Sequence, residues 1–229
     1  MDTGDSNVIT VHSPSGEYRA VVQVVPSTVQ YSTVQNLLSC NWRLSQGSLA
    51  ARCVIVTVHD LGTSQLSLSE FFSLPCLDPL TARCLLVHVS LPGQQPDQPD
   101  WEPGQTFPSL EDMSEAVLQI LEQLNLSEVI LLGVGVGANI AVRVCLSSPG
   151  KVLGVVVVQP LLAAAGILET ARARAAVGEL RAGHGKETDN LLLQHTFGNF
   201  VQGDRLLTDR QVGLLTTFRD QLHTSINPR

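Results

Sequence analysis

The 229-residue sequence predicts an α/β fold in which a mostly parallel sheet is flanked by helices. The first observation is a series of short apolar runs, rich in β-branched residues and each about one strand long. These runs are Cys53–Val58, Cys84–Val89, Val129–Leu132 and Val152–Val158. The second observation is that helix-like segments with apolar residues at helical spacing lie among these runs. Because strands covered by helices on both faces appear as continuous apolar runs, the alternation predicts strand–helix–strand units.

The N-terminal part of the chain predicts a strand pair followed by an irregular segment. Val8–Val11 and Tyr18–Val25 flank a Ser-Pro-Ser-Gly turn at residues 13–16, so they are expected to pair as a hairpin. Residues 26–51 are polar and show no period, which indicates an irregular insertion. We therefore predict a core over residues 1–160 that contains this insertion.

Helical patterns follow the later strands. Ser109–Leu124 has apolar residues at helical spacing, and Ser109 with Asp112 is typical of a helix N-terminal cap. Ala138–Leu146 is predicted to form the next helix. After Val158 no further β-branched run occurs. Instead, three helices are predicted, at Leu161–Ala182, Glu187–Phe200 and Leu207–Thr224. Residues 161–229 are therefore expected to form a helical cap-like region.

Composition and charge exclude several classes of function. The formal net charge is −7 and aromatic residues make up 4% of the chain, which argues against a nucleic-acid partner. The five cysteines contain no C-x-x-C spacing, and no His, Asp, Glu or Cys cluster has the spacing of metal ligands, so no metal site is predicted. Reduced thiols and the lack of an apolar leader predict a cytoplasmic protein. Residues 129–146 and 152–168 are interrupted by polar residues or proline, so no transmembrane segment is expected.

The segment from Val129 to Ile140 combines a strand, a glycine turn and a helix. Gly133, Gly135 and Ala138 fit the dinucleotide pattern G-x-G-x-x-A, but no acidic residue ends the next strand, as nucleotide recognition would require. Gly133, Gly135 and Gly137 also fit G-x-S-x-G, the nucleophile elbow of an α/β-hydrolase, except that glycine stands at the central position. Glycine has no side chain that could attack a carbonyl, so no catalytic residue and no cofactor are predicted.

His59 and Asp60 follow the first of the four apolar runs, where a hydrolase places its oxyanion loop. Without a nucleophile opposite them, the simpler interpretation is that they stabilise a turn. If the elbow geometry is kept, Gly135 is expected to have a positive φ, and Gly135→Ser should be tolerated better than Gly135→Val.

These motifs resemble the N-myc downstream-regulated (NDRG) family. The resemblance rests on Val58–Gly62, on Phe107–Leu110, on Gly133–Ala138, and most specifically on the tetrapeptide Pro92, Gly93, Gln94 and Gln95. It is clear over residues 53–160 and weaker over 195–229. The resemblance implies an α/β-hydrolase-like fold with a degenerate active site, and a non-enzymatic regulatory or scaffold protein in signalling, differentiation or stress responses that works through protein partners. The alternative is an esterase or other hydrolase of this fold whose catalytic groups were not recognised.

The last two strands of the hydrolase fold have no counterpart in the sequence pattern, so the late strands are expected to be missing. The run Val152–Val158 would then be an apolar edge strand. Because an uncharged β-branched edge can pair with another chain, self-association through residues 152–158 is expected.

Overall fold

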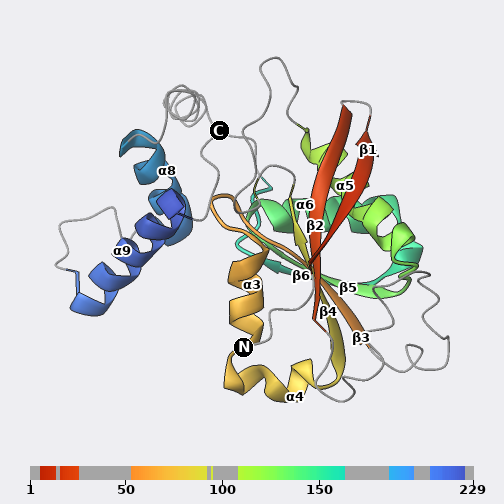
Figure 1. Ribbon diagram of the computed structural model, residues 1–229, viewed down its shortest axis with the longest axis horizontal. Helices are drawn as coiled ribbons and strands as arrows, with labels where there is room; N and C mark the ends of the chain where they lie inside the picture. The colour runs from red at the N-terminus through yellow and green to blue at the C-terminus, as the bar shows by residue number, and fades with distance from the viewer. Residues whose placement is uncertain are drawn as a thin grey trace. The chain divides into compact units, whose positions relative to one another are not determined.

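The computed structural model describes residues 6–13, 16–25, 53–91, 94, 108–162, 186–198 and 207–224. In this part of the chain, six strands form one sheet in the order β1-β2-β4-β3-β5-β6 (Figure 1). The strands are β1 (Ser6–Ser13), β2 (Gly16–Val25), β3 (Cys53–Val58), β4 (Cys84–Ser90), β5 (Val129–Val134) and β6 (Val152–Val158). The four strands β4, β3, β5 and β6 run parallel, whereas β1, β2 and β4 pair antiparallel. The predicted mostly parallel sheet is confirmed.

Helices lie on both faces of this sheet. They are α3 (Gln65–Phe72), α4 (Asp78–Thr81), α5 (Leu110–Gln123) and α6 (Val136–Ser147), with short 3-10 turns η1 (Pro75–Leu77) and η2 (Pro149–Lys151). Phe72 of α3 packs with Ile55 of β3 and Leu86 of β4 in one buried cluster. Val129 and Leu131 are buried too, and strand alternation directs them to the other face, where Figure 1 shows α5 and α6.

Local chemistry fixes the start of α5, and a side-chain contact ties the helix to β1. Ser109 and Asp112 form a reciprocal capping box: the Ser109 side chain accepts from Asp112 N, and Asp112 accepts from Ser109 N. Along the helix, the Gln119 side chain accepts from the backbone N–H of His12 and donates to the carbonyl of His12 in β1. The helix predicted at Ser109–Leu124 and its cap are therefore confirmed.

The sequence pattern did not predict helices α3 and α4 or the 3-10 turns η1 and η2. The α3 sequence, QLSLSEFF, buries Gln65, Leu68 and Phe72, so a polar residue occupies one of its three core positions. Two predicted features, the insertion at 26–51 and most of the helix at 161–182, lie outside the described residues. The apolar stretch 129–146 divides into β5 and α6, and no described helix is long and apolar enough to cross a membrane.

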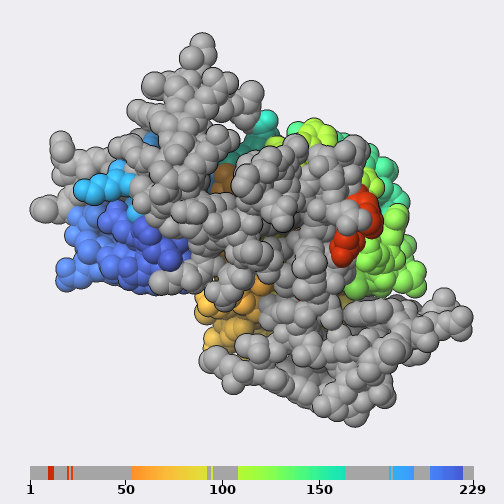
Figure 2. Space-filling view, turned by 45° about the horizontal axis from the view of Figure 1, so that its top comes forward, coloured from red at the N-terminus to blue at the C-terminus, as the bar shows by residue number. Residues whose placement is uncertain are grey.

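The chain divides into two compact units. The first contains the sheet with α3 to α6, and the second contains Leu61–Thr63 together with α8 (Lys186–Phe197) and α9 (Asp209–Thr224). Leu193, Phe218 and Leu222 form the core of this second unit, where Phe197 and Phe218 stack edge to face at 5.2 Å. Figure 2 shows the outer surface of these helices in blue. The predictions at 187–200 and 207–224 are close to the observed helices.

Candidate functional site

A sharp turn at Gly135 joins β5 to α6. The strand ends at Val134, the helix begins at Val136, and Gly135 between them has φ +56° and ψ −112°. L-residues rarely adopt this conformation, and it is the backbone shape that raises the nucleophile of a hydrolase above its sheet. The expected positive φ is therefore confirmed.

The glycines on either side of the turn let backbone segments approach closely. A Cβ atom on Gly137 would stand 2.2 Å from the carbonyl oxygen of Val58 and 2.5 Å from that of His59. A Cβ atom on Gly133 would stand 2.4 Å from the carbonyl oxygen of Gly137. Side chains at these two positions would force β3, β5 and α6 apart, so the glycines let the end of β3 lie beside the start of α6.

This close approach places the carboxylate of Asp60 against the turn. Asp60 Oδ1 accepts a hydrogen bond of 2.9 Å from the backbone N–H of Val136, the first residue of α6. A Cβ atom on Gly135 would lie 1.9 Å from Oδ1 and 2.1 Å from Cγ of Asp60. The carboxylate of Asp60 thus stands where the side chain of residue 135 would begin.

This contact bears on two possible functions of the turn, ester hydrolysis and dinucleotide binding. In an α/β-hydrolase, the N–H of the residue after the nucleophile is one donor of the oxyanion hole. Here that donor, Val136 N–H, already binds a carboxylate of the same chain. A bound pyrophosphate would need the same helix N-terminus, so the Asp60 contact also argues against the dinucleotide interpretation.

His59 is fully buried and hydrogen-bonded to backbone groups through both ring nitrogens. Nε2 accepts from the N–H of Leu91 at 3.0 Å, which means that Nδ1 carries the proton and donates it to the carbonyl of Asp60 at 2.9 Å. Burial lowers the pKa of His59 to about 4, although the hydrogen bond to Asp60 and its charge oppose this shift. The neutral ring holds the loop after β3 in place, which agrees with its interpretation as a turn-stabilising residue.

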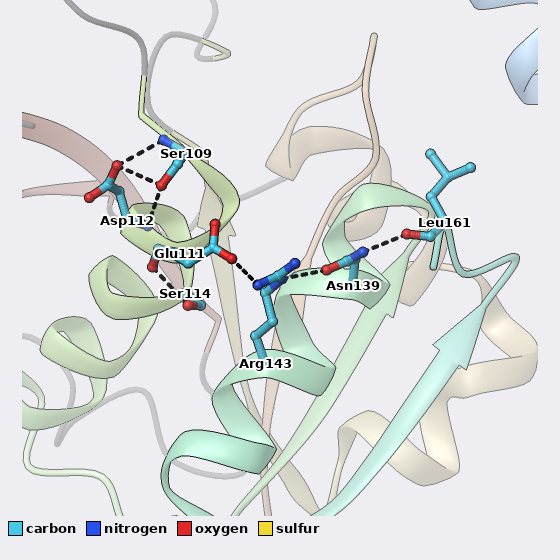
Figure 3. A network of polar contacts seen from close by, with 7 residues as sticks. All are labelled: Ser109, Glu111, Asp112, Ser114, Asn139, Arg143 and Leu161. Atoms are coloured by element: carbon cyan, nitrogen blue, oxygen red, sulfur yellow. Dashed lines mark hydrogen bonds and ion pairs between the residues drawn. The ribbon is translucent and has the colours of Figure 1, made fainter. Parts of the chain in front are cut away.

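The segment after β6 completes the surroundings of the turn. Gly135 N donates to the carbonyl of Val158, and Leu161 N donates to the carbonyl of Gly135. Figure 3 shows Asn139 of α6 donating to the carbonyl of Leu161, at 2.6 Å, while its side-chain oxygen accepts from Arg143. Arg143 also pairs with Glu111 of α5. The elbow is therefore bonded to Asp60 through Val136 N and to the segment after β6 through the backbone of Gly135.

His59, Asp60, Gly133, Gly135 and Gly137, the five predicted positions, come together at this turn. Of the tetrapeptide, Pro92, Gly93 and Gln95 lie outside the described residues. Gln94 is described, and its Oε1 atom is buried with no hydrogen-bond partner among the described residues. No three His, Cys, Asp or Glu side chains gather as a metal site in the described ranges.

Sequence reasoning missed a buried polar group on the face that α3 covers. His88 of β4 is fully buried, and its Nδ1 lies 2.7 Å from Oγ1 of Thr57 in β3. Its ring packs against Phe72, with the ring centroids 5.8 Å apart. Burial lowers the pKa of His88 to about 4. The only sequence signal was a histidine within an apolar run.

Solved structures of α/β-hydrolases share this fold. A hydrolase from Pseudomonas aeruginosa aligns with a TM-score of 0.60 and 15% identity, covering 96% of this chain and 68% of the other. A thermophilic esterase from Thermogutta terrifontis aligns with a TM-score of 0.65 and 12% identity, covering 97% and 68%. At these identities the likeness shows the fold, and it confirms the α/β-hydrolase-like prediction.

Sequence comparisons give the family. An uncharacterised protein of Caenorhabditis elegans is 31% identical over 159 residues, which cover 67% of this chain and 48% of that protein. Protein NDRG3 of Xenopus tropicalis is 31% identical over 116 residues, which cover 50% of this chain and 30% of that protein. The matches thus span half or less of the length of these relatives. The model of the Ndr family matches residues 44–229, and the chain therefore belongs to the Ndr family.

Proposed function

We propose that this protein is a non-enzymatic member of the Ndr family that acts as a regulatory or scaffold protein through protein partners. The observation that carries the proposal is the contact between Asp60 and the elbow. One carboxylate occupies the space of a side chain at position 135 and takes the N–H that would stabilise an oxyanion. The fold then serves as a scaffold whose former reaction centre is filled by its own side chain.

The electrostatics of the elbow also support the absence of acyl-transfer chemistry. A tetrahedral intermediate carries a negative oxygen, which needs a hydrogen-bond donor and no nearby anion. The carboxylate of Asp60 lies at the position that such an oxygen would approach, next to Val136 N. His59 precedes Asp60 in the sequence. Both of its ring nitrogens are hydrogen-bonded to backbone groups, so it is not available as a general base.

The proposed setting is the cytoplasm, in signalling, differentiation or stress responses. The support for this part is the resemblance to the NDRG proteins, together with the free thiols of Cys53, Cys76, Cys84 and Cys145. Fractionation of cells that express the tagged chain tests the location. Recovery in a secreted or organellar fraction would contradict it.

The enzymatic alternative is tested with p-nitrophenyl esters of two-, four- and eight-carbon acids. We expect the purified chain to hydrolyse them no faster than an unrelated acidic protein at the same concentration, since loss of a serine nucleophile costs on the order of 10⁶ in kcat in a protease. The same samples are treated with a fluorophosphonate probe. Turnover that scales with protein concentration and is stopped by the probe would mean that the protein is a hydrolase.

A further inference from the structure

Two cysteines lie side by side at the start of the central strands. Cys53 is the first residue of β3 and Cys84 the first residue of β4, and they are directly paired in the parallel register. Both belong to the cluster that contains Phe72 and Leu86, so their side chains share the face of the sheet that α3 covers. The elbow lies at the opposite end of β3, about 17 Å away along a six-residue strand.

The two thiols contact each other but differ in their exposure. Their thiols are close enough to affect each other, and Cys53 is partly exposed whereas Cys84 is buried. Burial raises the pKa of the Cys84 thiol, and the neighbouring Cys53 raises it further. An oxidant from solvent therefore reaches Cys53 first, and Cys84 stands behind it as a second thiol.

The backbone geometry suits a covalent link. Neighbouring strands lie about 4.8 Å apart, which is within the range of about 4.4–6.8 Å that disulfides require between Cα atoms. Both residues are at strand ends, where the chain can adjust more freely than at the centre of a sheet. The other described cysteines, Cys76 in η1 and Cys145 in α6, have no such register partner in the strands.

We propose that Cys53 and Cys84 form a reversible oxidation site, which hydrogen peroxide converts into an intramolecular disulfide. In the first step, the Cys53 thiolate attacks the peroxide: an S–O bond forms, the O–O bond breaks, and the leaving oxygen takes a proton and departs as water. In the second step, the sulfur of Cys84 attacks the sulfenic acid, an S–S bond forms, and the S–O bond breaks to release a second water. Two thiols are oxidised by two electrons, and one hydrogen peroxide is reduced to two waters.

The test uses the full chain, first reduced and freed of reductant, then treated with hydrogen peroxide and alkylated with N-ethylmaleimide. We expect the intact mass of the oxidised protein to show two fewer alkylated thiols. Peptide mapping should find Cys53 joined to Cys84, and dithiothreitol should restore both thiols. This wild-type experiment requires no variant to fold. Both residues remaining alkylated, or a disulfide to Cys76 or to a second chain, would overturn the proposal.

Variants then separate the two roles. In Cys84→Ser, Cys53 should accumulate as a sulfenic acid that dimedone traps, because no second thiol resolves it. In Cys53→Ser, neither the disulfide nor dimedone labelling of Cys84 is expected. Cys76→Ser is the matched control, since this cysteine is exposed and lies outside the pair, and its oxidised form should still contain the Cys53–Cys84 link. The ester assay is independent of all these outcomes.

Discussion

Asp60 is the residue whose carboxylate occupies the elbow. Its carboxylate caps α6 through Val136 N and fills the space beside Gly135, so the glycine and the carboxylate fit each other. A hydrolase elbow needs the reverse arrangement, a side chain at the turn and an open donor beside it. The two positions are therefore expected to be energetically coupled, although 75 residues separate them in the sequence.

A double-mutant cycle tests this coupling. Gly135→Ala should lower the free energy of unfolding by about 2–4 kcal/mol, because it places a Cβ on a positive-φ residue and against the Asp60 carboxylate. Adding Asp60→Ala removes the collision, so the double variant should be more stable than the sum of the two single changes by about 1–3 kcal/mol. Urea unfolding of the four proteins gives the coupling energy. Any side chain at position 135 would bring the same Cβ against Asp60, so we expect Gly135→Ser to be destabilised as well, and still less than Gly135→Val.

The control for this cycle is Gly137→Ala. Its Cβ would meet the backbone carbonyls of Val58 and His59, which no side-chain substitution can remove. Combined with Asp60→Ala, it should therefore show additive losses. Additive behaviour at Gly135 as well would contradict the proposed fit between the glycine and the carboxylate.

Two buried histidines make stability depend on pH. Burial lowers the pKa of His59 and of His88 to about 4, from 6.5 in the unfolded chain, so the unfolded state binds more protons between these values. Stability is therefore full above about pH 6.5 and is lost as the pH falls toward 4. We expect His88→Leu to reduce the stability difference between pH 7 and pH 5 by about 1–2 kcal/mol, measured by urea unfolding. An unchanged pH dependence in His88→Leu would show that folding does not lower the pKa of this ring.

Strands with continuous apolar runs, and the helix with a capping sequence, were predicted well from the sequence. Elements without such signals were missed. The runs Cys53–Val58 and Val152–Val158 became strands with the predicted limits, because a continuous run of β-branched residues favours the extended backbone of a strand. Helix α3 was missed because a polar residue, Gln65, occupies one of its three buried positions and interrupts the apolar pattern. The contact between Asp60 and Gly135 depends on the register of β3 and β5, which sequence spacing does not contain.

Helix α5 offers a test at the level of one element (Figure 3). Ser109→Ala removes the side chain that accepts from Asp112 N, and it should cost about 1 kcal/mol of unfolding free energy. Glu111→Ala removes the ion pair to Arg143. The Glu111 side chain is 70% exposed, so this change should cost well under 1 kcal/mol of unfolding free energy. Thermal or urea unfolding compares the two. A larger loss in Glu111→Ala would mean that the link between α5 and α6 matters more than the cap.

At the scale of the whole molecule, the described sheet has unequal edges. On one side, β1 is bound by α5 through Gln119 and through Gln123, which donates to the carbonyl of Thr10. On the other side, β6 pairs with β5 and has no other strand partner among the described residues. Leu153, Val156, Val157 and Val158 of this strand are between 42% and 64% exposed. Adjacent positions 156–158 point alternately to the two faces, so both faces of the edge are open to solvent.

An exposed, uncharged, β-branched edge is a template for pairing with another strand, so we predict that the chain self-associates through β6. Size-exclusion chromatography with light scattering should give a mass above 24.6 kDa that rises with protein concentration.

Val156→Lys places a charge on the strand and should shift the protein toward the monomer. Leu146→Lys is the control, because Leu146 is an exposed apolar residue of α6 and not of the strand, and it should leave the association unchanged. A wild-type mass of one chain at every concentration would show that the edge of β6 is protected in solution. Equal effects of the two lysine substitutions would show that association depends on general surface hydrophobicity and not on strand pairing.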